Sequence, residues 1–86
     1  MKNRLLKIWR EEIERELIVV RYDYTKKDGS VMKGYIIAQK HDGLWCSVSY
    51  GPHLDVTMRV YRAKVHARLR QKLAGYRYRR RRRRLI

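Results

Sequence analysis

No acidic residue follows Asp55, although the last 31 positions of this 86-residue chain hold 13 of its 23 lysine and arginine residues. The first 55 positions carry 10 basic and 8 acidic residues, so nearly all of the formal net charge of +15 belongs to the second part. A field of one sign concentrated in this way attracts an opposite polyanion but does not stabilise a fold. The charge therefore indicates a polyanionic partner.

Cysteine and long apolar runs are also scarce. The single cysteine, Cys46, excludes an internal disulfide, and one cysteine with three histidines cannot supply the thiolates of a closed zinc site. Cys46 follows Trp45 in an apolar stretch, so we expect both side chains to be buried. No apolar segment reaches the ~20 residues that span a bilayer, and the N-terminus lacks the apolar core and cleavage site of a secretory signal.

The length leaves room for one small domain, and its first part has a helical pattern. Apolar residues recur every four positions at Leu5, Trp9, Ile13 and Leu17, which predicts an amphipathic helix from Asn3 to about Leu17. Asn3 is expected to be its N-cap. On the opposite side acidic and basic residues stand four apart, which is typical of a solvated helix face.

Between about residues 17 and 50 the apolar period falls to two, and β-branched and aromatic residues predominate. Three antiparallel strands are expected at residues 18–24, 31–37 and 44–50, with Asp-Gly turns between them. Gly51-Pro52 ends the third strand, because proline cannot donate a ladder hydrogen bond. Residues 56–60 alternate as in a fourth strand, but Asp55 is also placed to cap a helix that begins there, so both readings stay open.

A second helix is predicted from about Tyr61 to Leu73, ended by Gly75, and nearly every position outside its apolar stripe is basic. Residues 76–86 contain six consecutive arginines, whose repulsion predicts a tail that is disordered unless bound. The predicted class is α+β, with an N-terminal amphipathic helix, a small antiparallel meander of three or four strands, a basic C-terminal helix and an arginine-rich tail. Residues 1–75 form the predicted domain and residues 76–86 the tail.

Arginine throughout this tail indicates phosphate recognition, because the guanidinium fork binds phosphate oxygens in pairs. Two tyrosines before the arginine run are placed either to stack on unpaired bases or to pack beside the helix end. The residues that we expect to contact nucleic acid are Arg59, Arg62, Lys64, Arg68, Arg70, Lys72, Tyr76, Arg77, Tyr78, Arg79, Arg80, Arg81, Arg82, Arg83 and Arg84.

Gly51-Pro52-His53, followed by residues 56–60 and by Arg62-Ala63-Lys64, resembles part of a double-stranded RNA-binding domain. The resemblance implies a proline-containing loop that meets the minor groove and a basic helix that meets phosphates. It covers about 15 residues, and in that family the loop precedes two further strands, whereas here three strands are expected before it. We therefore assign the chain to no family on these residues.

His41, His53 and His66, together with many arginines and tyrosines, are the residue types that a metal-independent ribonuclease uses. None of the three stands at a spacing that assembles a site by itself, and the chain lacks a phosphate-binding glycine loop, a nucleophile motif and paired carboxylates. The sequence therefore predicts no catalytic residue, no metal site and no cofactor.

Together these observations predict a non-enzymatic protein that binds nucleic-acid backbone largely independently of sequence. RNA is slightly favoured over DNA, as in a ribosomal protein or another ribonucleoprotein component. The alternative is a DNA-packaging, chromatin-type or viral structural protein, and further alternatives are a small ribonuclease and a protein-binding inhibitor. No membrane partner is expected, and the expected location is intracellular, in the cytoplasm or within a nucleoprotein particle beside other proteins.

Overall fold

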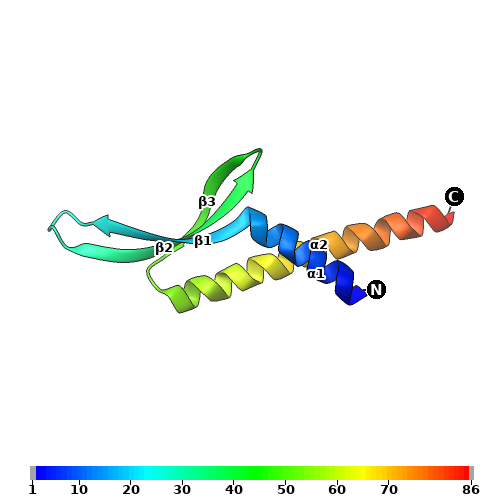
Figure 1. Ribbon diagram of the computed structural model, residues 1–86, viewed down its shortest axis with the longest axis horizontal. Helices are drawn as coiled ribbons and strands as arrows, with labels where there is room; N and C mark the ends of the chain where they lie inside the picture. Colours follow the sequence, from blue (N-terminus) through cyan, green and yellow to red (C-terminus); the bar gives the residue numbers. More distant parts are fainter. Residues whose placement is uncertain (1, 86) are drawn as a thin grey trace.

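The computed structural model describes residues 2–85, with side chains for residues 3–80. Helix α1 (Lys2–Glu16) leads directly into strand β1 (Leu17–Thr25), followed by β2 (Val31–His41), β3 (Leu44–Gly51) and helix α2 (Leu54–Leu85). The strands form one antiparallel sheet in the order β1-β2-β3 (Figure 1). The predicted α+β class is confirmed, with three strands.

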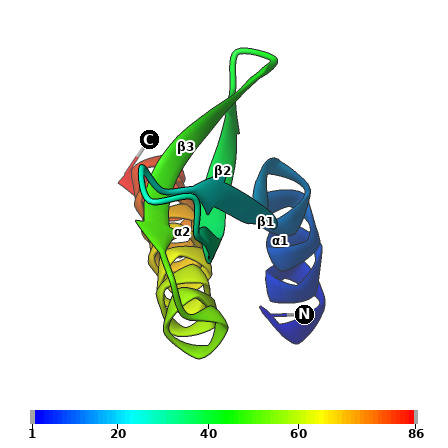
Figure 2. The same cartoon turned by 90° about the vertical axis from the view of Figure 1, so that its left-hand side faces the viewer.

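The hydrophobic core lies where the two helices meet the sheet. Figure 1 shows α1 crossing α2 near the middle of the molecule, and Figure 2 shows the helices side by side with the strands above them. The buried core side chains come from both helices and two strands, namely Ile13, Leu17, Ile37, Val65 and Leu69. Since the core is this small, each of its members contributes a large share of the buried apolar surface.

Helix α1 follows the predicted apolar stripe closely. Ile13 is buried, and Leu6 and Trp9 pack against the core. The helix already includes Lys2, so Asn3 lies in its first turn and the N-cap prediction is wrong. The next residue after the helix, Leu17, is 1% exposed and opens β1 without an intervening loop.

Both hairpin turns have the geometry that their Asp-Gly pairs predict. Asp42 and Gly43 have φ values of 50° and 79°, the two positive values that a tight two-residue hairpin turn requires. In the longer first turn, Gly29 has a φ of 88°. There the Asp28 carboxylate accepts hydrogen bonds from the Ser30 hydroxyl at 2.6 Å and from the Ser30 N–H at 2.9 Å, which lowers the pKa of Asp28.

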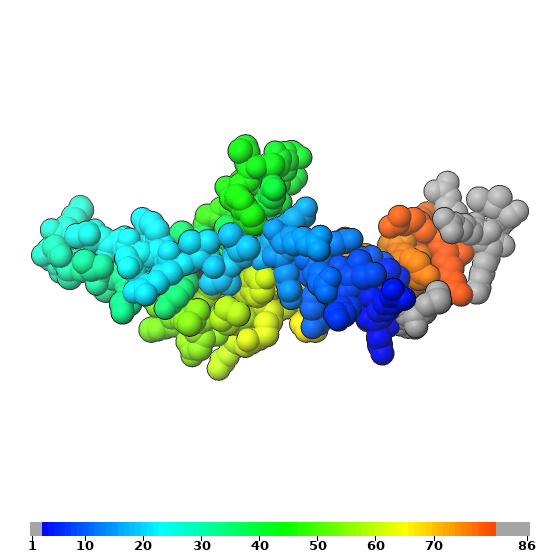
Figure 3. All heavy atoms as spheres, in the orientation of Figure 1, coloured from blue at the N-terminus to red at the C-terminus, as the bar shows by residue number. Residues whose placement is uncertain are grey.

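The two hairpins extend beyond the helices, and Figure 3 shows them as separate lobes of an elongated molecule. Trp45 and Cys46 lie on the β2–β3 hairpin, where Trp45 is 47% exposed and Cys46 is exposed as well. The expectation that both are buried is therefore wrong. An apolar period of two identifies a strand, but it does not tell whether a helix covers that strand.

Three tyrosines cover the face of the sheet that points away from the helices. The Tyr22 and Tyr24 rings are stacked with centroids 6.1 Å apart, and the Tyr24 and Tyr50 centroids are also 6.1 Å apart. The Tyr50 ring lies over the buried Gly34, where an added Cβ would be 2.8 Å from the ring. Hydrogen bonding to the Tyr24 hydroxyl raises the pKa of Tyr50 to about 12.

Helix α2 begins at Leu54, so the fourth-strand reading of residues 56–60 is wrong. The buried Thr57 donates its hydroxyl to the His53 carbonyl at 2.7 Å, which occupies a backbone acceptor just before the helix. Asp55 lies in the first turn, where a carboxylate complements the positive end of the helix dipole.

At its other end α2 continues through Gly75 to Leu85, although the sequence predicts that Gly75 ends it. Tyr76 packs edge-on against Trp9 of α1, with ring centroids 6.0 Å apart, and the Arg79 Nε donates to the Gly75 carbonyl at 3.4 Å. These contacts and the cations at the negative end of the helix dipole favour further turns. The prediction that residues 76–86 are disordered without a partner stays a prediction.

One hydrogen bond ties α2 to the junction between α1 and β1. The Tyr61 hydroxyl donates to the Leu17 carbonyl at 2.7 Å. Burial, with a smaller contribution from the Glu14 carboxylate, raises the pKa of Tyr61 above its usual value of 10.0. The neutral hydroxyl is therefore the form that the fold favours.

Replacing Tyr61 with phenylalanine should lower the free energy of unfolding by about 1–3 kcal/mol, because the Leu17 carbonyl loses its donor. Urea denaturation at neutral pH measures this, and Tyr78→Phe, at a side chain 63% exposed, is the matched control. The advantage of the wild type over Tyr61→Phe should be complete below pH 10 and should shrink as the pH rises through the raised pKa of Tyr61. A loss in Tyr78→Phe as large as that in Tyr61→Phe would contradict this role of the hydrogen bond.

Candidate nucleic-acid interface

The predicted cations of α2 lie in two rows on different sides of the helix. Residues three or four apart share a side of a helix. This spacing places Arg59, Arg62, Arg70, Arg77 and Arg80 in one row, with His66 between the second and third. It places Lys64, Arg68, Lys72 and Arg79 in another row. What each row faces determines whether its charges are neutralised.

Three hollows follow the first row along α2, and each adds cations from other elements. The first hollow joins Arg59 and Arg62 to Lys33 of β2. The second joins Arg70 to Lys7 and Arg10 of α1, and the third joins Arg77 and Arg80 to Arg4 of α1. We name these nine cations the basic track.

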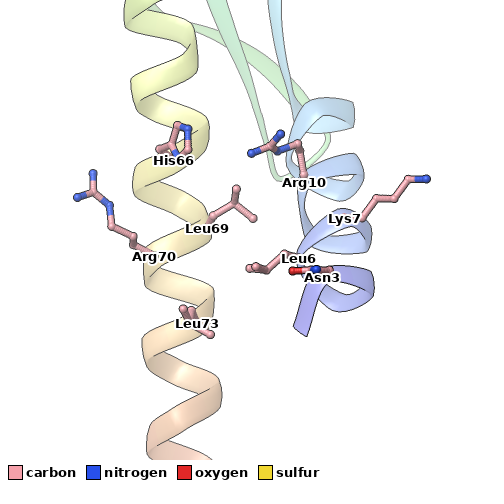
Figure 4. A pocket seen from close by; sticks show the side chains of 8 residues that line it. All are labelled: Asn3, Leu6, Lys7, Arg10, His66, Leu69, Arg70 and Leu73. Atoms are coloured by element: carbon pink, nitrogen blue, oxygen red, sulfur yellow. The ribbon is translucent and has the colours of Figure 1, made fainter. Parts of the chain in front are cut away.

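The second hollow lies between the two helices and has a volume of about 400 Å³. Figure 4 shows Leu6 of α1 and Leu69 of α2 pointing toward each other across this gap. The Arg10 side chain extends from α1 toward α2, and His66 lies on the facing turn of α2 (Figure 4). The hollow thus has an apolar floor and a polar, cationic rim.

The cations of the basic track have no acidic partners among the described side chains. The ion pairs found within residues 3–80 are Arg21–Asp23, His41–Asp42 and Lys72–Glu12, and none includes a member of the track. Within the same residues, Asp55 is the one carboxylate that lines any of the three hollows. Like charges held together without counterions repel one another, so this arrangement favours binding of an anion.

Two members of the second row of α2 face acidic residues instead. A fourth hollow brings Arg68 and Lys72 together with Glu12 and Glu16 of α1. Lys72 Nζ lies 3.3 Å from Glu12 Oε2, in an ion pair whose two side chains are both partly exposed. We name Lys64, Arg68, Lys72 and Arg79 the acid-facing row, because two of its members, Arg68 and Lys72, lie beside these glutamates.

Helix α1 supplies three cations of the track that the sequence reasoning missed. Its first nine residues, Lys2–Arg10, include four basic side chains and no acidic one, whereas residues 11–16 contain four glutamates. This order opposes the helix dipole, which favours acidic residues at the start and basic residues at the end. An arrangement that costs helix stability was the available signal that the start of α1 contributes to this cationic surface.

The remaining predicted site residues lie at the end of α2. Tyr76 packs against Trp9, whereas Tyr78 is 63% exposed, so the two tyrosines have different surroundings. The backbone of the arginine run is helical as far as Leu85. The side chains of four predicted contacts lie outside the described residues, namely Arg81, Arg82, Arg83 and Arg84.

The three histidines lie on different parts of the chain. His41 is at the β2–β3 turn and contacts Asp42, His53 lies between β3 and α2, and His66 is in the second hollow. Within residues 2–85 no three His, Cys, Asp or Glu side chains come together as metal ligands would. The structure therefore does not assemble the histidines into one site.

No family model matches this chain, and comparisons with curated proteins and with solved structures find no significant similarity. Neither described helix has the length and apolar character needed to cross a bilayer. The argument for function therefore rests on the distribution of charge and apolar surface described above.

Proposed function

We propose that this is a non-enzymatic nucleic-acid-binding protein whose basic track contacts the phosphate backbone largely independently of base sequence. The observation that supports this most is the convergence of nine cations from α1, β2 and α2 on one side of α2 without acidic partners among the described residues. Charges on a random surface would be mixed in sign, as they are in the fourth hollow, which has both cations and glutamates.

The dimensions of the track suit a nucleic-acid backbone. From Arg59 to Arg80 the helix rises about 32 Å, at 1.5 Å per residue. Duplex DNA carries a phosphate on each strand every ~3.4 Å along its axis, so roughly nine phosphates of one strand lie along this length. The number of cations in the track is similar, and arginines, which hold phosphate oxygens in pairs, are the majority.

Within this class we favour structured RNA over DNA, as in a ribosomal protein or another ribonucleoprotein component. Arginines beside accessible aromatic side chains, as at Tyr76 and Tyr78, suit folded RNA with unpaired bases. A first test is to purify the protein without nuclease treatment, measure its ultraviolet absorbance ratio, and digest the bound polymer with RNase or DNase. Copurifying RNA supports this choice, copurifying DNA favours a packaging role, and purification free of both contradicts the proposed function.

Deleting residues 79–86 should reduce the salt dependence of binding while leaving the fold intact, because the core side chains found in the described part of the chain all come before residue 70. Log affinity should fall against log salt by about 0.9 per neutralised phosphate on duplex DNA, or about 0.7 on a single strand. The truncated protein should therefore lose several units of slope. Fluorescence anisotropy with a labelled duplex measures both slopes, and an unchanged slope would remove the tail from the mechanism.

A further inference from the structure

The third hollow of the track has more apolar and aromatic lining residues than either of the other two. It lies between the first two turns of α1 and residues 73–80 of α2 and has a volume of about 390 Å³, within the range of ligand pockets. Six apolar or aromatic side chains form its floor, namely Leu5, Leu6, Ile8, Trp9, Leu73 and Tyr76. A purely electrostatic phosphate contact would not need such a floor.

The floor includes two aromatic side chains that remain partly exposed. Trp9 and Tyr76 meet edge to face, with centroids 6.0 Å apart and planes at 67°. Tyr76 retains 36% exposure and Ile8 retains 45%, although both belong to the lining of this hollow. Such surfaces attract flat aromatic groups, because every nucleobase has a π-face that stacks on an aromatic side chain.

The rim of the same hollow carries positive charge alone. Arg4, Arg77 and Arg80 line it, no carboxylate is among its described lining residues, and none of these arginines belongs to an ion pair within residues 3–80. An occupant that matches both parts has a flat apolar group for the floor and anionic groups for the rim. A nucleotide that projects from a nucleic-acid strand has this composition.

We propose that the hollow between α1 and the end of α2 binds the base of an unpaired nucleotide, while Arg4, Arg77 and Arg80 contact the flanking phosphates. This inference rests on the proposed function and makes it more specific. A base inside a duplex is stacked and paired on both sides, so it enters the hollow only from a single strand, a loop or a bulge. The protein should therefore prefer strands with unpaired bases over strands that offer phosphates alone.

The test uses Trp9 as the reporter in the full-length chain. Trp45→Phe leaves Trp9 as the one tryptophan, and Trp45 is on the exposed β2–β3 hairpin, away from the core. This variant is titrated with a single-stranded oligonucleotide of about 12 nucleotides and with an abasic strand that has the same number of phosphates. We expect the base-carrying strand to quench Trp9 and to bind about tenfold more tightly, the effect of one stacked base.

A matched pair of variants locates the effect. Tyr76→Leu should remove most of the preference for bases and keep the salt dependence, whereas Tyr78→Leu, outside the hollow, should keep the preference. Equal affinity of the wild-type chain for abasic and base-carrying strands would overturn this inference and leave the proposed function standing. If neither strand binds, this inference and the proposed function are both overturned. Tighter binding of the protein to anionic lipid vesicles than to either strand, followed by Trp9 fluorescence, would also overturn both.

Discussion

Replacing Ile37 with alanine is expected to cost about 2–5 kcal/mol of unfolding free energy, the range for a buried aliphatic side chain that leaves a cavity. Ile37 has no exposed surface and belongs to the small cluster in which both helices meet the sheet. Because small domains have a total stability of only several kcal/mol, the variant should be largely unfolded near body temperature. Urea denaturation followed by circular dichroism measures the loss.

Trp45→Ala is the control for this prediction, because it removes a larger apolar side chain from a strand of the same sheet. With 47% of its surface exposed, on a hairpin that the helices do not cover, Trp45 should change the unfolding free energy by less than about 1 kcal/mol. If Trp45→Ala unfolds the protein while Ile37→Ala is tolerated, the core has been placed on the wrong part of the sheet.

Removing three charges from the basic track should weaken nucleic-acid binding far more than removing three charges from the acid-facing row. The first variant combines Arg62→Ala, Arg70→Ala and Arg77→Ala. If each arginine neutralises one phosphate, its loss costs about fivefold at physiological salt, so the triple variant should bind roughly 100-fold more weakly. Anisotropy titration with a labelled duplex measures the affinity.

The matched variant combines Lys64→Ala, Arg68→Ala and Arg79→Ala. It has the same net charge as the first variant and the same number of alanines in α2, but its lost cations lie on the other side of the helix, where Arg68 lines a hollow with Glu12 and Glu16. We expect its affinity to fall by less than about tenfold. Thermal melts of both free proteins should stay close to that of the wild type, because none of the six side chains belongs to the core.

The elements of this fold were predictable because their patterns are local. The four-residue spacing from Leu5 to Leu17 places α1, and Asp42-Gly43 places a turn whose positive φ values few other pairs adopt. Residues 56–60 were ambiguous, because a helix and a strand can both begin after Gly51-Pro52. The continuation of α2 beyond Gly75 is favoured in part by the contact of Tyr76 with Trp9, which is distant in sequence and therefore invisible to a local pattern.

The candidate site was predictable in composition but not in layout. The sequence shows that the charged residues after Asp55 are all basic, and it does not show that the helix divides them between a side with Glu12 and Glu16 and a side where Asp55 is the one described carboxylate that lines a hollow. That division depends on where α1 crosses α2. The contribution of Lys7 and Arg10 was missed for the same reason, since charges on a separate helix join a site only through tertiary packing.

The most direct test of the basic track is the slope of log affinity against log salt for the two triple variants on one duplex of about 20 base pairs. Slope counts released counterions, so it reports phosphate contacts separately from any small change in fold. We predict that the Arg62, Arg70 and Arg77 variant loses about 2–3 units of slope relative to the wild type, whereas the Lys64, Arg68 and Arg79 variant loses less than about one. Equal losses in the two variants would contradict the account, because net charge rather than the placement of the track would then govern binding.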